Sequence, residues 1–189
     1  NKIQEEVPEF ELVEEKNPEF SNNIEKLEKG QRIKLCNILS GKKIDIEIMS
    51  STEESECDLF VIMIDDNGKA REENIVFYNQ LKSKNGNILL KVENEFQKAM
   101  INLNDIETNV EKIKIFSSNG KIKESKLAIL IQEEDIKYNY TFGNFNEKCK
   151  TVECFEIYRY NGEWKGKLVD DGYDRDIAQI LKSYAIEIV

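Results

Sequence analysis

Apolar and polar residues alternate along most of the chain after residue 30, which is the pattern of β-strands buried on one face. In the segment IDIEI (44–48), three isoleucines point one way while the two acidic residues point the other. Ten segments are predicted as strands on this basis: 32–39, 42–50, 57–65, 74–81, 87–94, 98–104, 112–118, 126–132, 152–160 and 163–169. Strands that follow one another with almost no helical pattern between them predict a mainly β fold.

The dipeptide Asn-Gly occurs four times, each time between two predicted strands. A type I′ turn needs positive φ at both central residues, and Asn followed by Gly meets this need at low cost. The four turns lie at residues 67–68, 85–86, 119–120 and 161–162. Short hairpins repeated in this way predict a two-sheet antiparallel β-sandwich.

A convincing helical pattern occurs only near the C-terminus, in residues 174–188. This segment opens with aspartates suited to an N-cap, and its apolar residues then recur at helical spacing. These apolar residues are Ile177, Ile180, Leu181 and Tyr184. One short helical turn is also predicted within residues 104–112. The expected fold is therefore a β-sandwich with one C-terminal α-helix.

The first 29 residues differ from the rest of the chain. They hold both prolines, nine glutamates against four lysines, and two copies of the triplet Pro-Glu-Phe. Proline interrupts helices, and a strong acidic excess disfavours independent packing. We therefore expect residues 1–29 to be an acidic linker or N-terminal arm, with Phe10 and Phe20 touching a single domain formed by residues 30–189. The alternative is a linear motif that a partner recognises.

Composition and charge restrict the classes of function. The formal net charge is −10, from 37 acidic and 27 basic residues, so we do not expect nucleic acid as a partner. No apolar run approaches the roughly 18 residues of a membrane helix, so membrane insertion is not expected either.

The content of histidine and cysteine bears on catalysis and location. The chain has no histidine, which removes the commonest general base, and we expect no enzymatic activity. The cysteines, Cys36, Cys57, Cys149 and Cys154, form no C-x-x-C pair. Free thiols are typical of a reducing compartment, which predicts a cytoplasmic protein.

Aromatic residues gather in the segment 154–173, around the only tryptophan, Trp164. The Asn-Gly turn at 161–162 lies between Tyr158 and Tyr160 on one side and Trp164 on the other. This arrangement predicts a hairpin that faces the core and is held by cross-strand aromatic pairs. By parity, Arg159 points to the face opposite Tyr158. A ligand site is the alternative, in which Arg159 holds a phosphate while an aromatic ring stacks on a base.

Three separated motifs resemble the TerD family of tellurite-resistance and stress-response proteins. The family shows Gly-Glu-x-Tyr-Arg, a turn, Gly-Glu-Trp-Lys and a final Gly-Tyr, and FEIYRYNGEWKGKLVDDGY (155–173) follows this order. The matching residues are Glu156, Tyr158, Arg159, Gly162, Glu163, Trp164, Lys165, Val169, Gly172 and Tyr173. LEKGQRIKL (27–35) and IVFYNQL (75–81) resemble two further family segments. The resemblance spans residues 27–189, and it implies a calcium-binding β-sandwich that acts in stress resistance rather than as a catalyst.

One segment departs from the resemblance. The family's calcium loop, Gly-Asp-Asn … Gly-Asp-Asp-Glu, is replaced by KVENEFQKAMINL (91–103), which contains neither glycine nor aspartate. Calcium needs six to eight oxygen ligands at about 2.3–2.6 Å, so we expect calcium binding to be lost or weakened. Glu56 and Asp58 lie where the family has Asp-x-Asp, and they are the remaining weak candidates for metal ligands. Solvated surface charge is the alternative interpretation of these two residues.

Two other acidic segments carry oxygen atoms that could bind a metal ion. In DDNGKAREEN (65–74), an EF-hand loop with Gly68 as its sixth residue would run from Met63 to Asn74, and neither end suits a ligand. We therefore predict a hairpin turn there. The acids in 169–176 are predicted mainly to cap the last helix, with metal binding as the alternative.

Three functions are hypothesised from the sequence. The leading one is a non-catalytic interaction domain of a cytoplasmic stress-response system, with protein partners and no confident cofactor. The second is a functional calcium-binding domain whose ligands come from Glu56, Asp58 and the acids of 170–176. The third is a small-ligand module, of the kind that binds cyclic nucleotides, built on Tyr158, Arg159 and Trp164.

Overall fold

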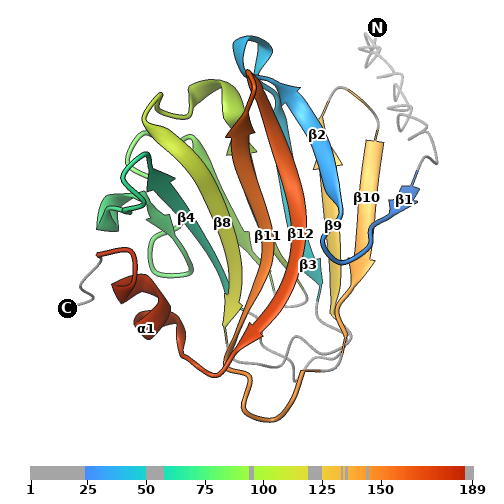
Figure 1. Cartoon of the computed structure of the whole chain (residues 1–189), viewed down its shortest axis with the longest axis vertical. Coiled ribbons are helices and arrows are strands. Elements are labelled where there is room, and N and C mark those ends of the chain that lie inside the picture. The colour runs from blue at the N-terminus through green and yellow to red at the C-terminus, as the bar shows by residue number, and fades with distance from the viewer. Residues whose placement is uncertain are drawn as a thin grey trace, which may run out of the picture.

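Two six-stranded sheets pack face to face in the computed structural model, which describes residues 24–49, 58–93, 96–118, 125–132, 134, 136–143 and 145–185 (Figure 1). Sheet A has the order β1 (Ile24–Lys26), β10 (Ile136–Thr141), β9 (Lys126–Ile131), β3 (Lys43–Met49), β7 (Phe96–Asn102) and β6 (Ile88–Val92). Sheet B has the order β2 (Arg32–Asn37), β12 (Glu163–Tyr173), β11 (Thr151–Tyr160), β8 (Val110–Ser118), β4 (Asp58–Asp65) and β5 (Ile75–Val76). The paired strands are antiparallel except for β1 and β10. The prediction of a two-sheet antiparallel β-sandwich is confirmed.

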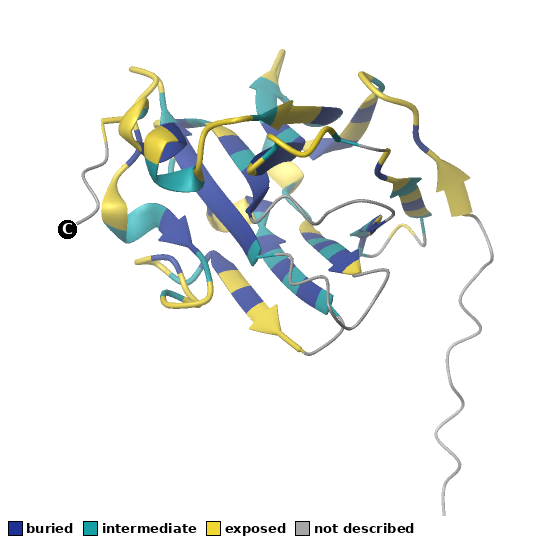
Figure 2. Ribbon diagram, turned by 90° about the horizontal axis from the view of Figure 1, so that it is seen from below, coloured by how far each residue is buried: buried dark blue, intermediate teal, exposed yellow. Residues whose placement is uncertain are grey.

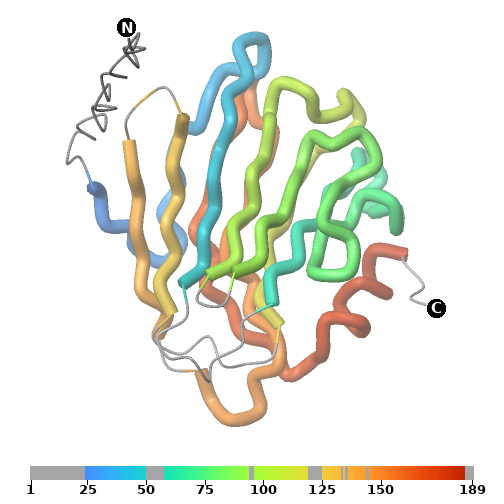
Figure 3. The backbone as a smooth tube through the Cα atoms, turned by 180° about the vertical axis from the view of Figure 1, so that it is seen from behind, coloured from blue at the N-terminus to red at the C-terminus, as the bar shows by residue number. Residues whose placement is uncertain are grey.

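Alternation along the strands creates the core between the sheets. Strand β3 lies at the centre of sheet A (Figure 3). On this strand, Ile44, Ile46 and Ile48 are almost fully buried, while the acidic residues between them are partly exposed. β9 beside it repeats the pattern with three buried apolar residues. Figure 2 shows the same stripes of buried and less buried positions on both sheets. The hydrophobic effect on one face of each strand therefore fixes which side chains form the interior.

The Asn-Gly turns take two forms. At Asn161-Gly162 both residues have positive φ, 50° and 75°, as a two-residue type I′ hairpin requires. At 67–68 and 85–86 only the glycine has positive φ, the geometry of a longer hairpin loop with a left-handed glycine. The predicted hairpin after β4 is present, and Asp65 closes it by accepting hydrogen bonds from the backbone N–H groups of Asn67 and Lys69. The turn predicted at 119–120 lies outside the described residues.

Three parts of the fold differ from the strand predictions. The segment predicted at 74–81 forms only the two-residue β5, because backbone hydrogen bonds between Phe77 and Gln80 close a tight turn. Strand β10 was not predicted, although Ile136, Tyr138 and Tyr140 alternate along it. Strand β1 lies within the predicted arm and is followed by the buried Leu27, so residues 24–27 are part of the described sandwich. The expected contacts of Phe10 and Phe20 lie outside the described residues.

The C-terminal helix is shorter than predicted and covers part of sheet B. It is α1 (Ile177–Lys182), and 3-10 turns occur at Ile38–Ser40, Glu72–Asn74 and Leu103–Asp105, the last in the segment where a helical turn was expected. Ile180 and Leu181 pack against apolar residues on the outer face of β4 and β8. The residues of this second core are Phe60, Ile62, Ile64, Ala70, Ile75, Phe116, Ile180 and Leu181. Helix α1 is thus held by packing as well as by its own hydrogen bonds.

Replacing Asp176 with alanine is expected to destabilise the protein by about 1 kcal/mol. Asp176 accepts a hydrogen bond from the backbone N–H of Gln179, whose side chain accepts from the backbone N–H of Asp176 in return. The measurement is thermal unfolding, where a midpoint lower by about 2–4 °C is expected for a chain of this size. Asp174→Ala removes the same charge from an exposed position and serves as the matched control. An equal loss in both variants would contradict a capping role.

Candidate functional site

The segment in the place of the family's calcium loop, residues 91–103, forms an ordinary hairpin. Residues 88–92 and 96–102 are β6 and β7, and the backbone N–H of Glu93 donates to the carbonyl of Phe96 across the turn. Strands project neighbouring side chains to opposite faces, so the described residues of this segment, 91–93 and 96–103, do not bring several oxygen atoms to one point. The predicted strand character of 87–94 and 98–104 is confirmed in outline.

Lysines occupy the surface of this hairpin. Lys91 and Lys98 lie directly opposite one another, and both ammonium groups lie about 6 Å from the ring centroid of Phe96. Lys91 Nζ lies 2.9 Å from a carboxylate oxygen of Glu93, and Lys98 Nζ lies 3.2 Å from Glu47. The carboxylates of Glu93 and Glu47 are therefore paired with lysines, and a divalent cation bound there would have to displace these ammonium groups.

Of the two residues proposed as weak metal ligands, Asp58 is described and Glu56 lies outside the described residues. Asp58 begins β4, and its Oδ1 accepts a hydrogen bond from Gln97 Nε2 at 3.2 Å. Gln97 belongs to β7 of the opposite sheet, and its Oε1 also accepts from the backbone N–H of Leu59 at 2.8 Å. Asp58 therefore takes part in a polar contact that links the two sheets.

The acids near the end of β12 form a separate group around Asp170. This residue is 7% exposed and has φ of 54°, a left-handed conformation that is uncommon outside glycine. Lys29 donates to its backbone carbonyl at 2.8 Å and pairs with Asp171 at 2.9 Å. Tyr140 donates its hydroxyl to Asp170 Oδ2, whereas Oδ1 has no partner among the described residues.

Burial is the largest cause of the pKa shifts of Asp170 and Tyr140. It raises the pKa of Asp170 above its usual range, despite the hydrogen bond from Tyr140 and the nearby charge of Lys29. Burial and the hydrogen bond to Asp170 raise the pKa of Tyr140 to about 12. The Asp170 carboxyl is thus bonded to one tyrosine hydroxyl, while Lys29 binds the backbone carbonyl of the same residue and the carboxylate of Asp171.

The two acidic regions are not brought together. Asp58 and Tyr173 lie in the same row of sheet B, but β8 and β11 stand between their strands. Three strand spacings amount to about 14 Å, too far for one ion to bridge. Among the residues that the structure describes, no group of three or more Asp, Glu or Cys side chains is placed to hold a metal ion.

The hairpin at 154–173 differs from the predicted aromatic arrangement. The two-residue turn pairs Tyr160 with Glu163 and Arg159 with Trp164, so Trp164 is not opposite a tyrosine. Trp164 is fully buried, whereas Tyr160 is 53% exposed and Tyr158 is partly exposed on the outer face. The expectation of a core filled by cross-strand aromatic pairs is therefore wrong for the tyrosines, because register places them on the solvent side.

Arg159 faces inward and contacts other residues of the protein. Its guanidinium carbon lies 4.2 Å from the ring centroid of Trp164, which is a cation–π contact. Its Nε donates to the carbonyl of Val110 at 2.7 Å and its Nη2 to that of Glu107 at 3.1 Å. The arginine thus fastens the loop before β8 to the hairpin through its Nε and Nη2 donors.

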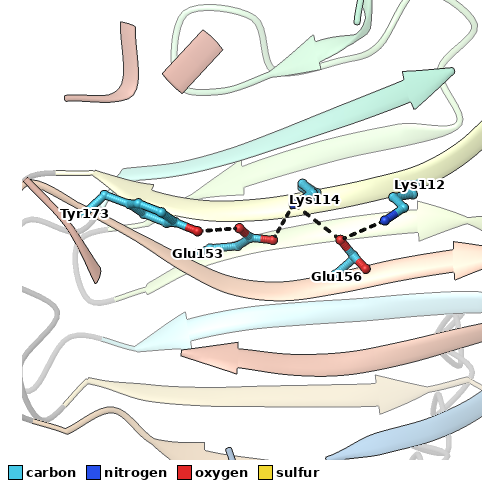
Figure 4. Close-up of polar contacts among 5 residues, drawn as sticks. All are labelled: Lys112, Lys114, Glu153, Glu156 and Tyr173. Atoms are coloured by element: carbon cyan, nitrogen blue, oxygen red, sulfur yellow. Dashed lines mark hydrogen bonds and ion pairs between the residues drawn. The ribbon is translucent and has the colours of Figure 1, made fainter. Parts of the chain in front are cut away.

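The outer face of sheet B holds a row of linked charges (Figure 4). Lys114 Nζ lies 2.8 Å from Glu153 and 3.4 Å from Glu156, which is also 3.7 Å from Lys112. Tyr173 donates its hydroxyl to Glu153 at 3.1 Å. Burial alone would lower the pKa of Lys114, but the hydrogen bond and charge of Glu153 outweigh it and raise that pKa.

Beside this row lies a groove that sequence reasoning missed. It has a volume of about 760 Å³ and runs over β2, β12 and β11. Its charged residues include Lys34, Lys165 and Lys167, and Tyr158 and Tyr160 add two rings. The sequence does show polar residues alternating with core residues in RIKL (32–35) and EWKGKLV (163–169). Only the order of the strands in the sheet brings these two segments side by side to form the groove.

The fold and the geometry define an antiparallel β-sandwich in which the candidate acids Asp58 and Asp170 are engaged by an amide and a hydroxyl, and Glu153 by a lysine. The family model of the TerD domain matches residues 24–184, and the chain belongs to this family. The match begins where β1 begins and ends just after α1, so it covers the whole described sandwich.

Several proteins are similar to this chain. General stress protein 16U of Bacillus subtilis (strain 168) is 25% identical over 190 residues, covering 86% of this chain and 97% of that protein. Tellurium resistance protein TerD of Serratia marcescens is 27% identical over 157 residues, covering 71% and 80%. A crystal structure of a protein of unknown function, SAV2460, superposes with a TM-score of 0.58 at 14% identity, covering 75% of this chain and 95% of that one. That last likeness supports the fold alone.

Within the part of the chain that is described, none of the helices has the length and apolar character needed to cross a membrane.

Proposed function

We propose that this protein is a non-catalytic interaction domain of the tellurium-resistance and stress-response type that acts in the cytoplasm and has lost or weakened the calcium binding of its family. Membership of the TerD family and the names of the similar proteins support the stress-response role. The free thiols of Cys36 and Cys149 are consistent with a reducing compartment.

The observation that carries the loss of calcium binding is the hairpin at 91–103. Its lysines lie opposite one another and pair with Glu93 and Glu47, where a calcium site needs unpaired oxygen atoms. The engagement of Asp58 by Gln97 also supports the proposal, because a ligand there would give up a contact between the sheets.

Calcium is expected to leave thermal stability unchanged. A site with a dissociation constant of about 10 µM would stabilise the native state by about 2.7 kcal/mol at 1 mM calcium, which raises the unfolding midpoint by about 5–10 °C. We expect a shift below about 1 °C in a thermal scan of EDTA-treated protein at 1 mM calcium, and no saturable heat in a calorimetric titration. Magnesium at the same concentration controls for general screening of the negative charge.

A clear rise in midpoint with submillimolar calcium, absent with magnesium, would overturn the proposal. It would instead favour a functional calcium-binding domain. The specific observation behind that second candidate is the buried Oδ1 of Asp170, which has no partner among the described residues. Asp170→Asn would then abolish the calcium effect, and this variant tells the two candidates apart.

A further inference from the structure

The outer face of sheet B is only half covered. Helix α1 and the second core lie over β4 and β8, whereas no described element lies over β11, β12 and β2 (Figure 1). The groove of about 760 Å³ lies on this open half. It is large enough for several amino-acid residues and much larger than a single phosphate or carboxylate ion.

The charge of the groove is opposite in sign to the net charge of the molecule. Its five cations are Arg32, Lys34, Lys112, Lys165 and Lys167, and its two carboxylates are Glu156 and Glu163. The groove is therefore positive in a chain whose formal net charge is −10. Such a local positive potential attracts acidic groups and repels basic ones.

Strand pairing places like charges face to face. Arg32 on β2 lies directly opposite Lys167 on β12, and Lys34 lies directly opposite Lys165. Like charges directly opposite each other in an antiparallel pair destabilise a sheet. Two such pairs in succession have a cost to folding, and a bound anion would remove that cost.

The protein's own carboxylates compensate the repulsion only in part. Glu163 is shared by Lys34 at 2.6 Å and Lys165 at 3.8 Å, and the hydrogen bond from Lys34 lowers its pKa. Arg32 and Lys167 form no ion pair with any residue of the described ranges. The end of the groove at Arg32 and Lys167 thus presents two cations that are available to an incoming carboxylate.

Two tyrosines supply a surface for side chains between the charges. Tyr158 lies opposite Lys165 on one side and Lys112 on the other, and the ammonium of Lys165 is 4.5 Å from the ring centroid of Tyr160. Tyrosine offers a large rigid contact area together with a hydroxyl, and it is enriched at energetically important positions of protein interfaces. The groove combines aromatic anchors with a positive rim.

We propose that this groove binds an extended acidic segment of a partner protein, with Arg32, Lys167 and the lysines holding its carboxylates and Tyr158 and Tyr160 contacting the side chains between them. The proposal rests on the interaction role proposed above and names the surface and the chemistry of the partner. A nucleic acid fits less well, because a long polyanion would extend past the groove onto a negative surface.

Fluorescence anisotropy with a fluorescein-labelled decaglutamate peptide tests the proposal. We expect saturable binding to the full chain at 50 mM salt that weakens at 200 mM, since exposed charges are screened. The double variant Arg32→Gln/Lys167→Gln is expected to lower the affinity by about tenfold. The same variant should keep or raise the unfolding midpoint, because it removes a repulsive pair. A merely structural role for these cations would lower it.

Lys126→Gln/Lys137→Gln is the matched control, since it removes two exposed lysines from sheet A. An equal loss of binding in the control, or no saturable binding of decaglutamate up to 1 mM, would overturn the proposal. Tighter binding of a labelled 20-nucleotide poly-dT would overturn it in favour of nucleic acid. A tenfold gain in peptide affinity after replacing the glutamates of residues 1–23 with glutamine would assign the groove to the chain's own acidic segment instead. None of these results depends on calcium, so this proposal can fail while the proposed function stands.

Discussion

Replacing Glu153 with glutamine is expected to lower the free energy of unfolding by about 3 kcal/mol. Glu153 is 5% exposed, and its two oxygens accept hydrogen bonds from Lys114 and Tyr173. Glutamine preserves the shape but leaves the mostly buried ammonium of Lys114 without its main counter-charge. Glu156 remains 3.4 Å from that ammonium and partly compensates its charge. The expected loss of stability therefore lies at the lower end of the range of about 3–5 kcal/mol for breaking a buried ion pair.

Urea unfolding of the variant and the wild type gives this difference directly. Two controls separate charge from packing. Lys112→Gln removes a lysine that is about half exposed and pairs at 3.7 Å, so it should cost less than about 1 kcal/mol. Lys114→Met combined with Glu153→Leu removes both charges and should recover most of the loss, as hydrophobic replacement of a buried pair often does. If Glu153→Gln were as stable as wild type, the pair would not be buried in solution.

The same pair sets how stability changes at high pH. Glu153 raises the pKa of folded Lys114 above 10.5, so the native state keeps a proton that the unfolded chain releases. Burial and the charge of Glu153 raise the pKa of Tyr173 to about 12, which has the same sign. The stabilisation is complete below pH 10 and falls as pH rises beyond it. Urea unfolding between pH 9 and 11 should show this fall, and Glu153→Gln should reduce it.

The framework of the molecule follows from local pattern. Alternation placed Ile44, Ile46 and Ile48 in the core, and the spacing of Ile180 and Leu181 identified the buried face of the last helix. Both features depend on burial of one face of an element, which a few adjacent residues are enough to show. The strands that local pattern does not predict, such as β1 in the acidic arm, are stabilised by pairing with a neighbouring strand and not by their own composition.

The candidate sites depend on pairing between distant strands, which local pattern does not contain. Arg32 meets Lys167 only because β2 and β12 are neighbours, although more than 130 residues separate them. The partners of Asp58 come from the opposite sheet and likewise needed the structure. The pairing of Arg159 with Trp164 was accessible, since counting outward from the two-residue turn at 161–162 makes them opposite.

Replacing Trp164 with alanine is expected to cost about 3–5 kcal/mol, the largest effect of a single substitution predicted here. Its ring is fully buried in the main core and carries the Arg159 guanidinium on one face. Removal leaves a large cavity and also leaves Arg159 without its stacking partner, while the loop carbonyls of Glu107 and Val110 still hold the guanidinium in place. The loss of core packing and the loss of the cation–π contact both come from removing the same ring.

A double-mutant cycle separates them. Arg159→Met should remove the cation–π contact and the loop hydrogen bonds, and its coupling to Trp164→Ala should reach about 1–2 kcal/mol, as for a desolvated cation–π pair. Tyr160→Ala, at a position 53% exposed, is the control and should change stability by less than about 1 kcal/mol. Thermal or urea unfolding followed by circular dichroism reports all four variants independently of the lost tryptophan. Additive effects of Arg159→Met and Trp164→Ala would mean a coupling energy of zero. The arginine would then fasten the loop without support from the ring, and the cation–π contact at 4.2 Å would not contribute to stability.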